Sequence, residues 1–243
     1  HWLDRPPEAD WQGVLFANEV IDALPTTRFS VRDGEVFEEH VALDGERRFV
    51  INDRPADALV AAAVRHVERD IGTPFADGYR SEILPQLPYW IQAVAGSLHR
   101  GAMLFLDYGY VRREFYLPER SSGTLRAYFR QHAHNDPFRY PGLQDLTASV
   151  DFTALAEAGN SGGFAVAAYL PQAQFLIASG LQEAFAAEHA AAPDEAARYA
   201  LSQQVKHLTL PGAMGERFQA IAFARGVREV PAGLAAFDLS RRL

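Results

Sequence analysis

Residues 14–25, Val-Leu-Phe-Ala-Asn-Glu-Val-Ile-Asp-Ala-Leu-Pro, decide the fold of this chain. The apolar run from Val14 to Ala17 is typical of a buried strand, and it ends at two polar residues, Asn18 and Glu19. In open α/β sheets, ligands bind beyond the carboxyl ends of the strands. The stretch therefore predicts a functional strand end or, equally well on spacing alone, a helix cap followed by a loop.

A second apolar run, at residues 102–106, ends in a similar way at Asp107-Tyr108-Gly109-Tyr110. Between the two runs, the pattern at 88–100 predicts a helix that Gly101 closes. Two strands that each end in an acid, with a helix between them, are the βαβ signature of a parallel sheet. The sequence therefore predicts an α/β fold, although Asp107 also suits a capping role.

The segment between these strands contains an antiparallel part. Asp-Gly pairs at 33–34 and 44–45 separate alternating runs, which predicts a three-stranded meander over about 27–52. An amphipathic helix follows at 59–70, and residues 81–85 read as a short link. Within that link, Glu82 is open to two interpretations, a helix-start residue or a functional acid.

Residues 111–152 show no sustained period and are rich in Arg, Tyr, His, Asp, Pro and Gly. A stretch of this length inside a domain is functional or disordered, and its aromatic content favours order. Beyond it the pattern predicts helices at 152–158, 171–189 and 193–208, and strands at 164–169 and 218–224.

Composition narrows the function classes. The chain has 243 residues, 48% of them hydrophobic, and no apolar stretch long enough for a membrane span. A formal net charge of -8 argues against a general nucleic-acid binder, which needs a basic footprint. Cysteine is absent and no export signal is visible at the start, so we expect a cytoplasmic protein.

Other catalytic motifs are weak. His132, His134 and Asp136 invite a metal interpretation, but a loop that satisfies local backbone groups explains them better, so we predict no metal. Residues 159–163, Gly-Asn-Ser-Gly-Gly, lack the spacing of a nucleophile elbow. The chain has no G-x-G-x-x-G motif and no P-loop, and so no nucleotide-binding fingerprint of its own.

Several blocks together resemble the MidA-type S-adenosylmethionine-dependent methyltransferases, a family that includes a mitochondrial complex I assembly factor acting on an arginine. The first block, at 17–25, resembles the family pattern A-N-E-x-x-D-A-x-P. The others follow in the family's order: Asp107-Tyr108-Gly109-Tyr110, Gly123-Thr124-Leu125, His132 with Asp136-Pro137, Pro141-Gly142, and residues 145–152. The resemblance as a whole runs from Trp2 to the C-terminus.

The resemblance implies the family's fold, a mostly parallel seven-stranded sheet in the order 3-2-1-4-5-7-6. On that template residues 2–4 end strand 3, 14–18 form strand 4, 102–107 strand 5, and 164–169 and 218–224 strands 6 and 7. We expect one domain over 1–243, with insertions at about 27–52 and 111–152. Strands 1 and 2, with the glycine-rich cofactor loop, would precede His1, because without strand 1 strand 4 is an open apolar edge.

The resemblance also implies an activity, methyl transfer from S-adenosyl-L-methionine to a protein arginine, with a respiratory complex I subunit as a candidate partner. The predicted catalytic residues are Asn18, Glu19, Asp22, Asp107, Tyr108, His132 and Asp136; the predicted cofactor contacts are Trp2, Leu3, Asn18 and Glu19. Two alternatives remain open: a non-catalytic assembly or scaffold protein with this fold, and a methyltransferase that acts on a small-molecule amine. The sequence does not indicate an oligomeric state.

Overall fold

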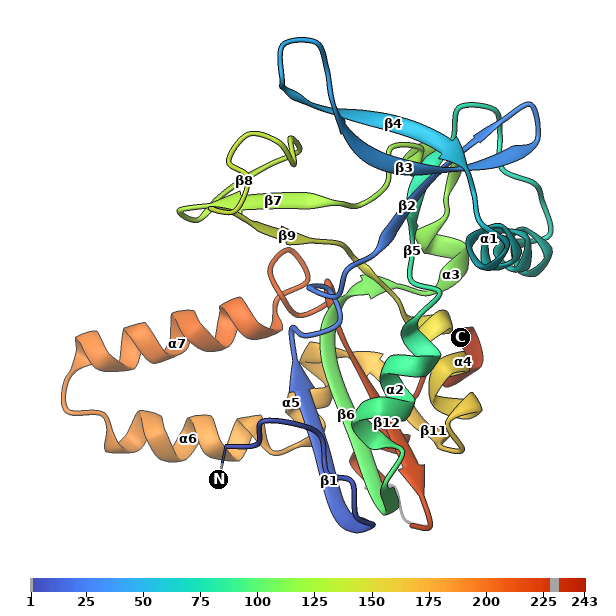
Figure 1. Cartoon of the computed structure of the whole chain (residues 1–243). Helices are drawn as coiled ribbons and strands as arrows, with labels where there is room; N and C mark the ends of the chain where they lie inside the picture. The colour runs from blue at the N-terminus through green and yellow to red at the C-terminus, as the bar shows by residue number, and fades with distance from the viewer. Residues whose placement is uncertain (1, 228–231) are drawn as a thin grey trace. The chain divides into compact units, whose positions relative to one another are not determined.

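The computed structural model describes residues 2–227 and 232–243, and the chain divides into two compact units (Figure 1). Unit 1 comprises residues 1–19, 88–109 and 155–243, and unit 2 comprises residues 20–87 and 110–154. Both segments expected as insertions, 27–52 and 111–152, belong to unit 2. The expectation of a single methyltransferase-like domain stays a prediction.

The sheet of unit 1 has the strand order β1-β6-β12-β11. β1 (Trp11–Asn18) runs parallel to β6 (Leu98–Tyr110), which confirms the predicted parallel pair. β12 (Phe218–Arg225) is antiparallel to both β6 and β11 (Ala165–Pro171), so the sheet is mixed and not mostly parallel. The α/β class is confirmed, and the assignment of family strand numbers stays a prediction.

Two glycines let β1 and β6 approach closely. Gly101 pairs with Gly13 in the register of the two strands and has a φ of 151°. A Cβ atom at Gly101 would overlap the carbonyl oxygen of Gly13, so no side chain fits there. Further along β6 the core begins, where the fully buried ring of Phe105 meets that of Phe223 on β12 edge to face, with centroids 6.1 Å apart.

The helices of unit 1 follow the predicted pattern with two corrections. The helix predicted over 88–100 ends at Ala95, because β6 already begins at Leu98. The single helix predicted over 171–189 is interrupted at Gly180, whose φ of 91° no ordinary helix residue adopts. The elements are α2 (Leu87–Ala95), α4 (Phe152–Ser161), α5 (Gln172–Ala178), α6 (Leu181–Ala191), α7 (Glu195–Thr209), α8 (Ala232–Ala235) and the 3-10 helix η2 (Ser240–Arg242); α6 and α7 form a hairpin (Figure 1).

The predicted meander is present in unit 2. β2 (Thr27–Arg32), β3 (Glu35–Leu43) and β4 (Phe49–Pro55) pair in sequence as antiparallel neighbours. The segment expected to be a link holds a fourth strand, β5 (Arg80–Ile83), which pairs with β2. The sheet order is therefore β4-β3-β2-β5. A run of four residues is too short for periodicity to distinguish a strand from a link.

α1 (Ala58–Ile71) packs its apolar side into the core of unit 2. Asp57 caps its first turn by accepting the Val60 N–H, and Gly72 ends it with a left-handed φ of 79°. The core that α1 completes is aromatic: the ring of Phe75 lies 5.5 Å from Phe29 and stacks on Tyr79 at 4.5 Å. These contacts give unit 2 a hydrophobic core of its own.

Residues 111–152, predicted to be irregular, contain short regular elements. A three-stranded sheet has the order β8-β7-β9, with strands of three or four residues. Such strands are too brief to show a two-residue period in the sequence. The elements are α3 (Arg112–Phe115), the 3-10 helix η1 (Pro118–Arg120), β7 (Arg126–Phe129), β8 (His132–His134), β9 (Asp145–Thr147) and β10 (Val150–Asp151).

The start of the described chain differs from the expectation. Residues 2–4, predicted to end a strand, are in no strand, because no described strand pairs with them. β1 lies at one end of the strand order of its sheet, and its Val14 and Phe16 side chains are 66% and 60% exposed. Within the described part of the chain, no helix is both long enough and apolar enough to cross a membrane.

Candidate functional site

The ends of β1 and β6 bring four predicted site residues to one edge of the unit 1 sheet. Asn18 pairs with Leu106 in the parallel register, and the Glu19 N–H donates to the Leu106 carbonyl oxygen at 2.9 Å. Asp107 and Tyr108 follow Leu106 directly on β6. The two polar strand ends predicted from the sequence are therefore neighbours in space.

Glu19 has an uncommon backbone conformation. Its φ of 50° lies in the left-handed region, which costs a non-glycine residue on the order of 1 kcal/mol and occurs in tight turns and at functional sites. The Asn18 side-chain amide donates to the Glu19 carboxylate at 3.3 Å, and both side chains are exposed. This carboxylate is therefore open to solvent, where it can bind a cation or accept a proton.

Asp107 stands in a different environment at the end of β6. It is only 1% exposed, and its Oδ1 accepts the N–H of Tyr108 at 2.9 Å. The half-buried Tyr108 ring packs on Phe218 with centroids 5.5 Å apart. This arrangement holds the backbone of the strand end, and the direct catalytic role expected of Asp107 and Tyr108 stays a prediction.

Asp22 belongs to unit 2, where it is 5% exposed. Its carbonyl oxygen accepts the Ala148 N–H at 3.0 Å, which ties the block at 17–25 to the block at 145–152. The family resemblance rests on both of these blocks, and the structure shows that they meet at this hydrogen bond. The participation of Asp22 in catalysis beside Glu19 stays a prediction.

The histidine loop of unit 2 shows local contacts. His132 and His134 are alternate residues of β8, and the His134 ring lies edge-on to Tyr140 with centroids 6.0 Å apart. The Asp136 carboxylate accepts the Phe138 N–H at 2.9 Å and so shapes the following turn. Among the described residues, no group of three or more His, Cys, Asp or Glu side chains could hold a metal ion. Catalytic roles for His132 and Asp136 stay predictions.

Two of the four predicted cofactor contacts are exposed. Trp2 is 102% and Leu3 68% exposed. The other two, Asn18 and Glu19, lie at the strand end described above. Contact of any of the four with the cofactor stays a prediction.

Glu82 is the acid whose role the sequence left open, and the structure gives it a third one. It lies in β5, is 1% exposed, and accepts the backbone N–H groups of Thr124 at 2.7 Å and Leu125 at 3.2 Å. The Thr124 hydroxyl and the Arg28 guanidinium also donate to it. Glu82 therefore anchors the Gly123-Thr124-Leu125 block, a partner that spacing along the chain does not reveal.

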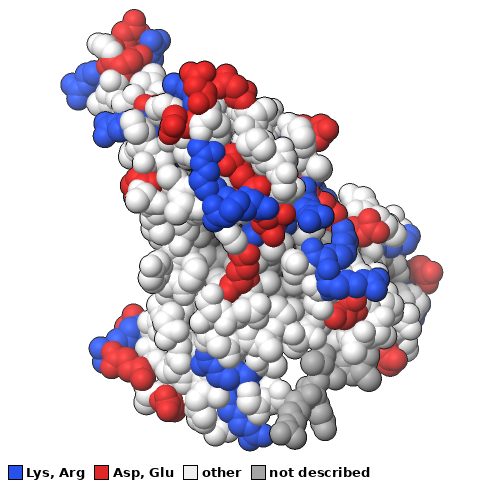
Figure 2. All heavy atoms as spheres, turned by 90° about the vertical axis from the view of Figure 1, so that its right-hand side faces the viewer, with Lys and Arg blue, Asp and Glu red and all other residues white. Residues whose placement is uncertain are grey.

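Charged side chains do not segregate on the face of the molecule in Figure 2, where acidic and basic groups are interleaved. This distribution shows no single-sign basic footprint on that face of the kind that a nucleic-acid backbone requires.

Polar residues at the ends of two parallel strands define this as an α/β protein with a candidate binding site at the edge of its sheet. Comparison with known proteins shows the family. Residues 1–170 match the family described as "Putative S-adenosyl-L-methionine-dependent methyltransferase", so the chain belongs to this methyltransferase family. The predicted family is confirmed. The chain is similar to "Protein arginine methyltransferase NDUFAF7, mitochondrial" of Danio rerio, with 27% identity over 212 residues, which cover 85% of this chain and 46% of that protein.

A second curated relative gives the same picture. The "Protein arginine methyltransferase NDUFAF7 homolog, mitochondrial" of Drosophila melanogaster is 28% identical over 228 residues, which cover 88% of this chain and 47% of the relative. The chain therefore spans about half the length of the curated relatives that it matches.

Two crystal structures from Burkholderia thailandensis match the whole chain. One protein, bound to S-adenosyl-homocysteine, superposes with a TM-score of 0.89 at 35% identity, and the chain covers 61% of it. A native structure from the same organism gives a TM-score of 0.90 at 36% identity, with 63% covered. The methyltransferase-like α/β fold is thereby confirmed, and the bound S-adenosyl-homocysteine agrees with the predicted cofactor, S-adenosyl-L-methionine.

Proposed function

We propose that the protein to which this chain belongs transfers a methyl group from S-adenosyl-L-methionine to an arginine of a protein. The family membership, the relative bound to S-adenosyl-homocysteine and the names of the two curated relatives support this proposal. The single observation that carries it is the exposed, left-handed Glu19 at the carboxyl end of β1, beside the polar end of β6.

The chemistry of the strand end fits the cofactor. S-adenosyl-L-methionine supplies, when bound, an electrophilic methyl group on a sulfonium. Its methionyl end carries an ammonium, which suits acceptors such as the Asn18 amide oxygen and the Glu19 carboxylate. In this proposal Trp2 and Leu3 add apolar surface for the adenine.

The residues of this chain would act mainly on the arginine. A guanidinium is charged and a poor nucleophile until it loses a proton. Glu19 and Asp22 would bind the cation, localise the lone pair on one nitrogen and accept the released proton. Asp107 and Tyr108 would hold the neighbouring strand end, and His132 and Asp136 would contribute from the segment at 111–152.

The proposed setting follows the relatives. A protein substrate fits their names, and the family resemblance suggests a subunit of respiratory complex I. For a eukaryotic source the proposed location is the mitochondrion, as in both curated relatives, and otherwise the cytoplasm.

The test is Glu19→Gln in the full-length protein. We expect nearly normal calorimetric binding of S-adenosyl-L-methionine, because the glutamine amide oxygen still accepts a hydrogen bond from the ammonium of the cofactor. Labelled-methyl transfer to protein should fall by about 100-fold or more, because the proton acceptor is gone. Glu188→Gln, at another exposed acid of unit 1, is the matched control and should keep full activity.

Unchanged turnover in Glu19→Gln would remove Glu19 from the mechanism. A folded wild-type protein that binds no cofactor would favour the scaffold alternative, and transfer only to small amines would replace the protein substrate.

A further inference from the structure

Unit 2 contains a hollow of about 930 Å³ that no predicted site residue except Asp136 lines. One side is formed by the sheet β4-β3-β2-β5, and the other by residues 122–126 and 135–138. All of the lining residues lie within unit 2.

Ion pairs cross the sheet side of the hollow in series. Glu39 accepts Arg28 Nε at 2.6 Å through one oxygen and Arg80 through the other. Asp53 in turn accepts Arg80 at 2.8 Å and Arg32. These five residues (Arg28, Glu39, Arg80, Asp53 and Arg32) form what we call the ion-pair ladder.

Burial divides the ladder into inner acceptors and outer donors. The Glu39 and Asp53 side chains are only 2% and 4% exposed, and the guanidinium groups already occupy their oxygens. The Arg80 and Arg32 side chains are 34% and 48% exposed. Each guanidinium carries five N–H donors, more than its partners in the ladder use. The ladder therefore presents hydrogen-bond donors to the hollow.

Arg126 adds a further cation from the opposite side. It donates to the Asn135 amide oxygen, and among the described residues it has no carboxylate partner. The Asp136 carboxylate also lines the hollow, but its Oδ1 accepts the Phe138 N–H. The N–H groups of Arg126, and those of Arg80 and Arg32 that the ladder leaves unused, suit an anionic acceptor such as a carboxylate, which guanidinium groups bind through charge-assisted hydrogen bonds.

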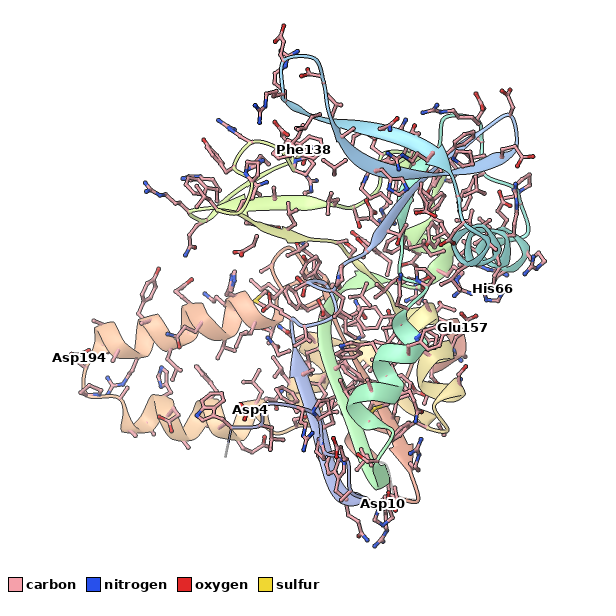
Figure 3. The ribbon with its side chains drawn as sticks, in the orientation of Figure 1. Asp4, Asp10, His66, Phe138, Glu157 and Asp194 are labelled. Carbon is pink, nitrogen blue, oxygen red and sulfur yellow. The ribbon has the colours of Figure 1, made fainter. Side chains whose placement is uncertain are left out.

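A second, apolar hollow of about 240 Å³ adjoins the first and shares Pro137 and Phe138 with it. Its other apolar side chains include Val41, Phe49 and Leu146, which are 58%, 46% and 45% exposed. Phe138 lies beside the β3–β4 hairpin, with its ring centroid 5.9 Å from that of Phe49 (Figure 3). Donors and apolar surface therefore stand next to each other.

We propose that these two hollows bind a polypeptide segment of the protein substrate in which a carboxylate side chain adjoins an apolar one. The inference rests on the proposed function insofar as that function supplies a protein substrate. A free phosphate would use the donors and leave the apolar hollow empty, whereas an acidic and apolar segment uses both. Recognition then occurs on unit 2, through residues other than Glu19.

The test is binding of a fluorescein-labelled dodecapeptide with two glutamates beside two leucines, followed by anisotropy. Two analogues replace glutamate with glutamine or leucine with serine. We expect both analogues to bind at least tenfold more weakly, and the parent peptide to bind more weakly as salt is raised. If inorganic phosphate displaces the parent peptide completely and the serine analogue binds as tightly as the parent, only the donors bind ligand and the proposal is overturned. Equal binding of all three peptides would also overturn it.

Arg126→Gln tests the site from the protein side, and we expect about tenfold weaker binding of the parent peptide. Arg126 is exposed, so circular dichroism should show an unchanged fold. Arg48→Gln, at an exposed arginine of the β3–β4 turn, is the matched control and should bind normally. An Arg126→Gln protein that binds as tightly as wild type would overturn the site.

The two proposals fail separately. Selective peptide binding by a protein that transfers no methyl group would sink the proposed function and keep this site. Methyl transfer by a protein that shows no preference for the acidic peptide would support the proposed function and overturn this site.

Discussion

Two acids of this chain, Glu19 and Glu82, look alike in the sequence and differ in the structure. Each occurs close to a proline and beside a short apolar run. Glu19 is exposed, sits in a left-handed conformation and accepts one side-chain amide hydrogen bond. Glu82 is 1% exposed and accepts four donors, from Arg28, Thr124 and Leu125.

Burial and hydrogen bonding thus separate a carboxylate that is available for chemistry from one that stabilises the fold. A buried carboxylate whose oxygens are all occupied has little capacity to bind another ligand, and its loss leaves buried donors without a partner. An exposed carboxylate in a strained backbone contributes little to stability and can respond to a ligand. The predictions below test this division through the free energy of unfolding, in order of decreasing effect.

Glu82→Gln should have the largest effect, a loss of about 3 kcal/mol in the free energy of unfolding. The neutral amide cannot balance the charge of the partly buried Arg28, and one of its two terminal atoms no longer accepts the loop N–H groups. Urea denaturation measures the loss. Glu46→Gln, whose side chain is 74% exposed, is the control and should change stability by less than about 0.5 kcal/mol.

Gly123→Ala should lower the free energy of unfolding by about 2 kcal/mol. Gly123 has a φ of 78°, and an added Cβ would also overlap the Glu82 carboxylate oxygens. Gly142, with a φ of 77° and no atom within 4 Å of an added Cβ, isolates the backbone cost alone, about 1 kcal/mol. Equal losses in the two variants would show that the Gly123 loop does not press on Glu82.

Alkaline pH should lower the free energy of unfolding by roughly 1 kcal/mol through two buried tyrosines of unit 2, after allowance for solvent screening. Burial raises the pKa of Tyr79 to about 12, and burial also raises the pKa of Tyr116 well above 10. Since the folded protein holds these protons more tightly, the stabilisation is complete below pH 10 and is lost as the pH rises through 12. Urea midpoints of wild type and Tyr79→Phe measured from pH 9 to 12 check this, and parallel curves would contradict it.

Glu19→Gln should have the smallest effect on stability, below about 0.5 kcal/mol, because its carboxylate is exposed. Thermal unfolding of the same variant that is used for activity provides the measurement. A loss comparable to that of Glu82→Gln would place Glu19 among the structural acids and break the comparison.

Much of the fold could be predicted from local patterns. The apolar run at 14–17, the Asp-Gly pairs and the period of residues 59–70 correctly indicate β1, the meander and α1, because each pattern lies within one element. The same reasoning missed β5 and the strands of residues 126–147, where four residues or fewer carry no period. Gly180 could have warned of the break between α5 and α6.

The site was predictable only in part. Asn18 and Glu19 were recognisable as a polar strand end because they follow an apolar run. The parallel pairing of β1 with β6 confirmed that two polar strand ends meet. The bonds from Thr124 and Leu125 to Glu82 join residues about forty positions apart, and the ion-pair ladder joins four strands, β2, β3, β4 and β5. Such contacts follow from sheet order, which spacing in a single sequence does not determine.

The ion-pair ladder has an evolutionary consequence. Because Glu39 and Asp53 are each shared by two arginines, no member can be replaced without altering the partners of its neighbours. A change at Asp53 alone would leave Arg32 without a carboxylate partner and Arg80 with Glu39 only, whereas a paired exchange with Arg32 would leave Arg80 facing a like charge. Drift at these positions should therefore proceed by concerted substitutions, and related chains should keep or lose the ladder as a whole.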